Sequence, residues 1–314
     1  MLDTFLATIS SMMVMLMCIV IGFILRKSGV LPENTTSVLS KLVLYVFAPA
    51  QIINAFVKNC TVESIQSEYQ LILYGCVAVT MGLAIGIPLS SLFAKDCDER
   101  NIYRYALVFA NCGYLGNAVV ELVLGQAALY QYILFNLPLN MVIYTWGFRV
   151  LTPVAKRQKQ NFLKCLLQPS VVAMIIGMIL GLSGLGKVLP EFAGTTLGNL
   201  AVCMGPAAML LTGFTIGGFA FGSLFRNQKV YFATALRLLV LPCVVVAVLY
   251  LLGADKQTLI LAMVAFGAAL GLNTVVIPAA YDGDTHTGAS MAVISHMAAV
   301  VTIPLLYALL NRIL

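Results

Sequence analysis

Long uncharged stretches alternate with short polar segments along the whole chain. Six stretches contain no Asp, Glu, Lys or Arg: 4–25, 69–94, 165–186, 192–225, 257–281 and 285–311. Each exceeds the roughly 20 residues that a helix needs to cross the hydrocarbon core of a membrane. Four further apolar stretches lie between them: 42–57, 105–120, 121–148 and 230–254. The pattern predicts an all-α membrane protein with ten transmembrane helices.

The composition indicates that lipid is the main solvent of this chain. Hydrophobic residues make up 61% of the 314 positions and charged residues only 10%, whereas soluble domains carry about 25% charged residues. The first stretch has no basic residue before it and no Ala-x-Ala site after it, so we expect a retained helix rather than a signal peptide. The eight cysteines lack metal-ligand spacing. We therefore expect no metal, no cofactor, no nucleic-acid partner and no enzymatic activity.

Lys and Arg are distributed unevenly between alternate loops. The loops after the first, third, fifth and seventh stretches hold 13 of them: Arg26, Lys27, Lys41, Lys95, Arg100, Arg104, Arg149, Lys156, Arg157, Lys159, Lys164, Arg226 and Lys229. The other side of the membrane receives only Lys58, Lys187, Lys256 and Arg312. Because cytoplasmic loops attract Lys and Arg, we expect a multi-pass protein of the plasma membrane with both termini outside.

The two halves of the chain repeat each other in several motifs. Ile-Gly-Phe-Ile-Leu at 21–25 matches Ile-Gly-Met-Ile-Leu at 176–180, and Ala-Pro-Ala at 48–50 matches Gly-Pro-Ala at 205–207. An odd number of helices per half inverts the second half relative to the first. We therefore expect two inverted five-helix repeats, 1–152 and 169–314, joined by a cytoplasmic linker at 153–168. Inverted repeats are typical of alternating-access transporters.

The fourth and ninth stretches carry residues that weaken helices at matching places. Asn111-Cys112-Gly113-Tyr114-Leu115-Gly116-Asn117 lies in the fourth, and Gly267 to Thr274, including Asn273, lies in the ninth. Glycine and Asn destabilise helix interiors, and non-helical backbone at membrane depth lines a cavity or is buried in protein. The pattern predicts two interrupted helices around an anion-binding site. Close helix packing through small residues is the alternative.

These motifs resemble those of the auxin efflux carrier family. The resemblance rests on Asn111-x-Gly113-x-x-Gly116, on Gly-Leu-Asn-Thr-Val-Val at 271–276, and on a tail from Gly288-Ala-Ser-Met-Ala to Ile-Pro-Leu at 303–305. It implies a ten-helix fold related to that of bile-acid sodium symporters. Helices 1, 2, 6 and 7 would form a scaffold, through which two copies would form a homodimer. Helices 3–5 and 8–10 would form a transport domain that moves in an elevator-type motion. Crossing helices 4 and 9 would hold a small organic anion.

One feature departs from the family pattern. The family usually places proline at the helix breaks, where this chain has Ala118 and Ala269. Alanine is the best helix former, so the breaks rest on Gly and Asn alone. The substitution keeps open a non-transporting membrane sensor with the transporter fold as the alternative to a carrier.

The candidate site residues follow from the motifs and from polar groups inside the stretches. Those assigned to substrate binding are Asn111, Gly113, Tyr114, Gly116, Asn117, Asn136, Gly271, Asn273, Thr274 and Arg237. Glu121 and His296 are the candidates for coupling to protons or sodium, because ionisable groups inside membrane spans are functional by default. For each charge a simpler interpretation exists: an interfacial Glu121, a snorkelling Arg237 and a hydrogen-bonded packing His296.

An intramembrane aspartyl protease is a further alternative, prompted by Asp282 and Asp284. Such an enzyme needs its two carboxyl groups on facing helices, whereas these two lie in one short loop. The chain also contains no nucleotide-binding loop, so a transporter driven by a second solute is preferred over a primary pump.

Overall fold

The computed structural model describes residues 2–156, 167–271, 273–279 and 283–313, and these residues form helices joined by loops, without a β-strand. The prediction of an all-α protein is confirmed. The helices are α1 (Leu2–Lys27), α2 (Thr35–Leu42), η1 (Val43–Phe47), α3 (Ala48–Asn59), α4 (Val62–Ser90), α5 (Cys97–Val108), η2 (Cys112–Gly116), α6 (Asn117–Val142), η3 (Ile143–Gly147), α7 (Phe148–Leu151), η4 (Val154–Lys156), α9 (Pro169–Leu182), η5 (Leu185–Val188), α10 (Glu191–Gly217), α11 (Phe221–Leu224), α12 (Gln228–Ala235), η6 (Leu236–Val240), α13 (Leu241–Leu251), α14 (Lys256–Gly267), α15 (Asn273–Ala279) and α16 (His286–Ile313).

Six helical runs among the described residues are long and apolar enough to cross a membrane. They are Thr35–Asn59, Val62–Ser90, Asn117–Leu151, Glu191–Gly217, Gln228–Leu251 and His286–Ile313. The shorter helices α9 and α14 are also apolar. The protein is therefore a multi-pass membrane protein, and the total of ten spans stays a prediction.

The boundary expected between the fourth and fifth stretches lies at a different residue in the structure. The sequence places it between Val120 and Glu121, whereas α6 runs past both and bends at Gly125, where φ is 87° and ψ is −179°. This positive φ suits glycine, which has no Cβ to clash with the backbone. Glu121 therefore lies one helical turn before the bend, near the end of the first helical part of α6.

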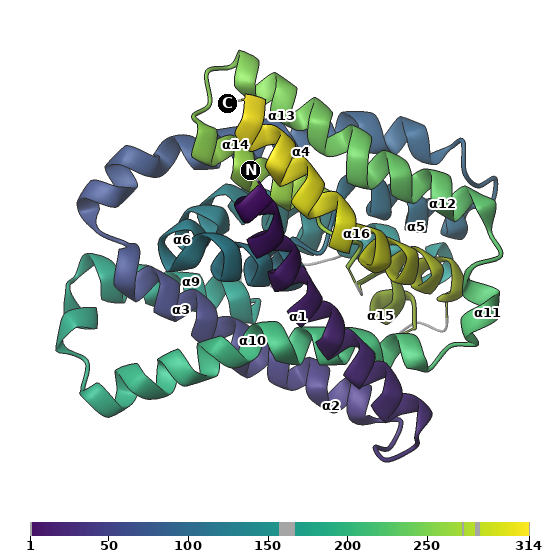
Figure 1. Cartoon of the computed structure of the whole chain (residues 1–314), viewed down its shortest axis with the longest axis horizontal. Helices are drawn as coiled ribbons and strands as arrows, with labels where there is room; N and C mark the ends of the chain where they lie inside the picture. Colours follow the sequence, from purple (N-terminus) through teal and green to yellow (C-terminus); the bar gives the residue numbers. More distant parts are fainter. Residues whose placement is uncertain (1, 157–166, 272, 280–282, 314) are drawn as a thin grey trace.

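Helices from the two halves pack against each other in a matched way (Figure 1). The first helix of each half, α1 or α9, packs along the second helix of the other half, α10 or α3. Glycines make both contacts close: a Cβ on Gly22 would lie 2.2 Å from the Leu210 carbonyl oxygen, and one on Gly177 would lie 2.8 Å from Phe56 Cβ. Gly22 and Gly177 occupy the same position in the repeated motif. Their equal roles agree with an internal repeat.

A second set of helices packs around α4, α6, α14 and α16. Helix α4 contacts α5 and α6, and α14 contacts α6, α13 and α16. Helix α12 also contacts α16. The predicted scaffold helices thus pack largely with one another, as do the predicted transport helices. The division of the chain into those two domains stays a prediction.

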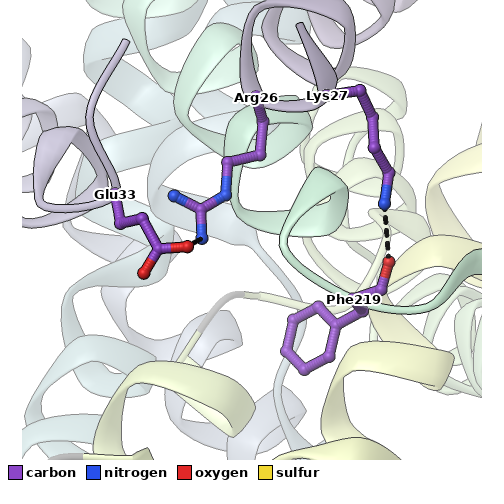
Figure 2. Close-up of polar contacts among 4 residues, drawn as sticks. All are labelled: Arg26, Lys27, Glu33 and Phe219. Atoms are coloured by element: carbon purple, nitrogen blue, oxygen red, sulfur yellow. Dashed lines mark hydrogen bonds and ion pairs between the residues drawn. The ribbon is translucent and has the colours of Figure 1, made fainter. Parts of the chain in front are cut away.

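Loops assigned to one side of the membrane contact one another in the structure. At the end of α1, Lys27 Nζ donates to the Phe219 carbonyl oxygen at 3.2 Å, and Arg26 pairs with Glu33 at 2.9 Å (Figure 2). Lys229 Nζ reaches the Phe93 carbonyl oxygen at 2.8 Å. These bonds join loops that the charge pattern places together on the basic side.

The opposite loops are joined in the same way. Asn59 Nδ2, at the end of α3, donates to the Gln126 carbonyl oxygen just after the bend at Gly125, at 3.4 Å. The beginning of α1 and the end of α16 lie close together in Figure 1, and these two helices contact each other. The alternation of loops is therefore consistent, while the assignment of inside and outside stays a prediction. The residues Arg157, Lys159 and Lys164 of the expected linker lie outside the described part.

Candidate functional site

Two non-helical segments of the chain meet inside the helix assembly. Helix α5 ends at Val108 and helical structure resumes at Cys112, while α14 ends at Gly267 and α15 begins at Asn273. We call residues 109–111 the first break and residues 268–271 the second break. The Asn111 backbone N–H donates to the Ala269 carbonyl oxygen at 2.7 Å. The two breaks are therefore bonded directly to each other. Ala269 lies in the second break, whereas Ala118 is helical.

The second break is held by α16. The Leu270 backbone N–H donates to Ser295 Oγ at 2.9 Å. Gly288 allows α16 to approach so closely that a Cβ there would lie 2.2 Å from the Thr274 carbonyl oxygen. Backbone groups freed by the loss of helical structure are thus satisfied by neighbouring segments, as membrane depth requires.

A cavity of about 370 Å³ opens beside the two breaks. Its lining is Thr36, Ser40, Leu44, Ala48, Ile52, Ala110, Asn111, Cys112, Gly113, Asn117, Ile133, Asn136, Asn140, Ile143, Phe148, Gln168, Ser170, Leu211, Gly271, Asn273 and Ile277. Amide and hydroxyl groups thus face apolar side chains, and none of the described residues in this lining carries a charge. The volume and the mixed lining suit a small organic molecule.

The paired residues Asn117 and Asn273 both line this cavity. Asn117 Nδ2 donates to Gln51 Oε1 at 3.3 Å, and Asn273 Nδ2 donates to the Tyr105 hydroxyl at 2.9 Å. Each side-chain NH₂ group has two hydrogens, so each can also donate to a ligand. The two positions that the sequence pairs across the repeats are brought to one site.

Other predicted substrate residues divide into those at the cavity and those behind it. Asn111, Gly113, Asn136 and Gly271 line the cavity. Asn136 Nδ2 donates to the Tyr132 carbonyl oxygen at 2.8 Å, while its buried Oδ1 has no partner among the described residues.

Gly116 and Thr274 are described and do not line the cavity. Gly116 lies against Tyr132, whose hydroxyl would be 2.1 Å from a Cβ on that glycine. Thr274 is fully buried and its hydroxyl donates to the Gly271 carbonyl oxygen at 3.0 Å. Tyr114 lies in η2, and its side chain lies outside the described structure.

A polar network extends from the cavity to Glu121. Gln51, fully buried on α3, accepts from Asn117 and donates to Glu121 Oε2. The other carboxyl oxygen, Oε1, accepts from Gln126 Nε2. Asn54 Nδ2 in turn donates to Gln126 at 3.5 Å. The half-buried acid is thus connected to the cavity by a single glutamine side chain.

Arg237 and His296 are buried and lie outside the cavity lining. Arg237 in η6 is 1% exposed, and its guanidinium carbon lies 5.3 Å from the centre of the Phe266 ring. His296 Nδ1 is 2.7 Å from the Ala292 carbonyl oxygen on its own helix. The snorkelling interpretation of Arg237 is thereby excluded, since its charge is enclosed. The local hydrogen bond of His296 fits a packing role.

Some residues at the site carried no distinctive signal in the sequence. Tyr105 and Ser295 hold the second break, yet an isolated Tyr or Ser in an apolar stretch is common. The cavity residues Gln168 and Ser170 flank Pro169, the first residue of α9. Proline at the first position of a helix is a recognisable start signal, so their place at a helix end was detectable.

The residues that suggested other activities form no site in the described structure. Asp284 Oδ1 accepts from the His286 backbone N–H at 2.9 Å, an ordinary turn contact. Asp282 lies outside the described residues. Within the part that the structure describes, no group of His, Cys, Asp and Glu side chains could hold a metal ion.

Comparison with known proteins identifies the family of this chain. Residues 7–307 match the model of the family described as membrane transport protein. The chain belongs to this family. The resemblance to auxin efflux carriers drawn from the motifs is confirmed. A protein of Methanothermobacter thermautotrophicus described as an uncharacterized transporter is 23% identical over 309 residues, which cover 96% of this chain and 98% of that protein. Membership of the family makes transport the activity to explain.

Proposed function

We propose that the protein is a secondary active transporter of small organic anions such as carboxylates, which bind in the cavity beside the two breaks. The observation that carries the proposal is the meeting of Asn117 and Asn273 at one cavity, next to two breaks that bond to each other. Interrupted helices at corresponding places of two halves mark the binding sites of transporters.

The chemistry of the cavity favours an anion over a cation. Asn side chains offer N–H donors without the desolvation cost of a charge. Cys112 and Gly113, at the start of the helical run that continues into α6, also line the cavity. The start of a helix carries partial positive charge. No carboxylate among the described lining residues would repel an anion.

The packing supports movement of one set of helices against another. In this proposal the repeats contribute ten helices, with broken helices 4 and 9 crossing at the cavity. The set containing α1, α3, α9 and α10 is the scaffold and the dimer surface. The remaining helices carry the site across the membrane in an elevator-type motion. Glu121 is the first candidate for coupling to protons or sodium, because it alone of the two candidates connects with the cavity.

Orientation in the plasma membrane follows from the basic loops, with both termini outside. The test is a single cysteine introduced at Ile313 and exposed to a membrane-impermeant thiol reagent in intact cells. Labelling before lysis agrees with the proposal, whereas labelling only after lysis contradicts it.

The binding site is tested with Asn117→Ala and Asn273→Ala. Each change removes donors that would bind the substrate anion, and a charge-assisted hydrogen bond is worth about 1.5–3 kcal/mol. Affinity should therefore fall about tenfold or more. Isothermal titration calorimetry of purified protein with glycerate and malonate measures the affinity. Asn199→Ala is the matched control, since Asn199 is exposed on α10 and does not line the cavity.

Two results would contradict the proposal. If both cavity variants bind like Asn199→Ala, the breaks are only packing devices. If wild-type protein binds these anions but reconstituted vesicles do not accumulate or exchange them, the protein is a sensor with a transporter fold. This is the alternative suggested by Ala118 and Ala269, which replace the usual prolines.

A further inference from the structure

Arg237 carries a charge in the protein interior that the described structure leaves uncompensated. Its three guanidinium nitrogens have no hydrogen-bond acceptor among the described residues. The ion pair found among the described residues joins Arg26 to Glu33 at the end of α1, so it does not neutralise Arg237. Arg remains protonated in proteins, and a buried charge without a partner is costly. The Phe266 ring and the nearby end of α14 offset part of that cost.

The guanidinium lies behind the wall of the cavity. Arg237 is two to three residues from the middle of the span Gln228–Leu251, which is about 4 Å at the helical rise. The segment η6 that carries it contacts α5 and α14, the two helices that end at the breaks, and the cavity opens beside those breaks. An anion in the uncharged cavity would therefore feel this positive charge in surroundings of low dielectric constant.

Glu121 provides a second charge close to the same site. It lies one helical turn from Asn117 on α6, so both face the same side of that helix. Its two carboxyl oxygens accept from Gln51 and Gln126, an arrangement that suits the ionised form. Gln51 belongs to α3, across the boundary between the two helix sets. Movement of α6 relative to α3 would break this bond.

Other charged or titratable groups also lie around this segment of α6. Lys58, in the last turn of α3, acts electrostatically on Glu121. Tyr307 of α16 packs against the same segment. Glu68 of α4 is bonded to Gln131 in a separate group. Of these groups, Glu121 is the one bonded to the network that reaches the cavity, so we take it as the group beside the site that exchanges a proton.

We propose that Arg237 and Glu121 make the carrier an electroneutral cotransporter of one organic monoanion with one proton, an inference that rests on the proposed function. In the empty site, guanidinium and carboxylate together carry no net charge. The bound monoanion adds one negative charge, and one proton taken up by Glu121 from water removes it. A net charge is costly inside the membrane. The transport helices therefore move when the site is empty or when it holds both the anion and the proton.

Binding and protonation are linked by the geometry. A monoanion held by Asn117 is a like charge one helical turn from Glu121, and a like charge disfavours a carboxylate. A protonated Glu121 is a weaker hydrogen-bond acceptor than the carboxylate. Protonation therefore weakens the hydrogen bond from Gln51, which joins α6 to α3. Substrate binding therefore prepares the moving helices for release.

The experiment uses vesicles containing the purified protein, a trapped pH dye and glycerate as the monoanion probe. Wild-type protein should move one proton per glycerate with no net current, relative to protein-free vesicles. Glu121→Gln should lose the proton flux, and Glu121→Asp should keep it. The control Glu191→Gln, at an exposed glutamate, should behave like wild type. Arg237→Met should bind glycerate at least tenfold more weakly, and Arg237→Lys should retain most of the affinity.

The outcomes separate this inference from the proposed function. Proton flux that persists in Glu121→Gln, a net current with wild-type protein, or a requirement for sodium overturns the inference. Should Glu121→Gln fail to fold, wild-type protein in weakly buffered detergent decides: one proton taken up per bound glycerate supports it, and none overturns it. If wild-type protein binds neither glycerate nor malonate, the proposed function falls, and the inference with it.

Discussion

The two breaks occupy equivalent places in the halves of the chain, yet their surroundings differ. After the first break, Asn117 is bonded to Gln51 on α3 and through it to Glu121. After the second break, Asn273 is bonded to Tyr105 on α5. Helix α3 packs with α9 and α10, whereas α5 packs with α4. Asn117, after the first break, therefore lies at the boundary between the two helix sets, and Asn273, after the second, lies inside one of them.

Because of this difference, we expect the segments around Asn117 and Asn273 to have different roles in transport. A movement between the helix sets would separate Asn117 from Gln51 but leave Asn273 with Tyr105. The second break should behave as a rigid part of the moving set. The first should respond to the movement and to the charge of Glu121. Substitutions on each side can test this contrast.

The largest effect is expected just after the second break, from Gly288→Ala at the contact between α16 and α15. The added Cβ would lie 2.2 Å from the Thr274 carbonyl oxygen, and backbone cannot yield as a flexible side chain can. The free energy of unfolding should fall by about 3 kcal/mol, measured by thermal or denaturant unfolding in detergent. Gly194→Ala is the control, because a Cβ there meets nothing within 4 Å. Equal stability of the two variants would show that the second break is not rigid.

At the first break, Gln51→Leu should mainly speed the movement between the helix sets. It removes the acceptor for Asn117 and a donor to Glu121 in one change of similar size. The bond from Gln51 to Glu121 has to break when α6 moves relative to α3, so the loss of a hydrogen bond to a charged group, about 2 kcal/mol, should lower that barrier and raise the initial uptake rate at saturating substrate by up to roughly thirtyfold. Gln66→Leu, at an exposed position of α4, is the matched control. Unchanged uptake would mean that the network does not take part in movement.

These two sites also show what the sequence could predict. The spacing in the sequence pairs Asn117 with Asn273, and a repeated motif pairs Gly22 with Gly177. Such pairs can be predicted because equivalent positions of two repeats lie in similar surroundings. The network at Glu121 could not be predicted, since it joins residues about 70 apart. The charge of Glu121 suggested a helix end, and Glu121 lies one turn before the bend at Gly125; the amides that satisfy its carboxyl oxygens belong to α3 and α6, and the one on α3 is distant in the sequence.

The contrast is also visible in what the sequence said of Arg237. A charge in an apolar stretch can reach water along its own flexible side chain or lie enclosed, and the pattern of one helix does not distinguish these cases. Enclosure depends on Phe266 and on the helices α5, α14 and α16 that contact η6. The all-helical class was readable from local pattern; the environment of each charge was not.

A smaller effect is expected from Tyr105→Phe. The change removes only the hydroxyl that accepts from Asn273 Nδ2 at 2.9 Å, and Asn273 can still bind a ligand. The loss of about 1 kcal/mol for a neutral hydrogen bond should weaken glycerate binding about fivefold. Tyr69→Phe, on an exposed part of α4, controls for the loss of a hydroxyl. A loss as large as that of Asn273→Ala would show that Tyr105 itself contacts the ligand.

The smallest effect on stability is expected from Gly271→Ala, at the point where the breaks meet. A Cβ there would lie 3.6 Å from Asn111 Cα, an ordinary contact, and the residue has no positive φ. Unfolding free energy should change by about 0.5 kcal/mol or less, since the stiffer unfolded chain offsets any crowding. Because Gly271 lines the cavity, glycerate titration gives an independent reading. Stable protein that no longer binds glycerate would place the ligand against the backbone of the second break, where only glycine leaves room. Unchanged binding would place it on the Asn117 side, next to the network that we infer carries the proton.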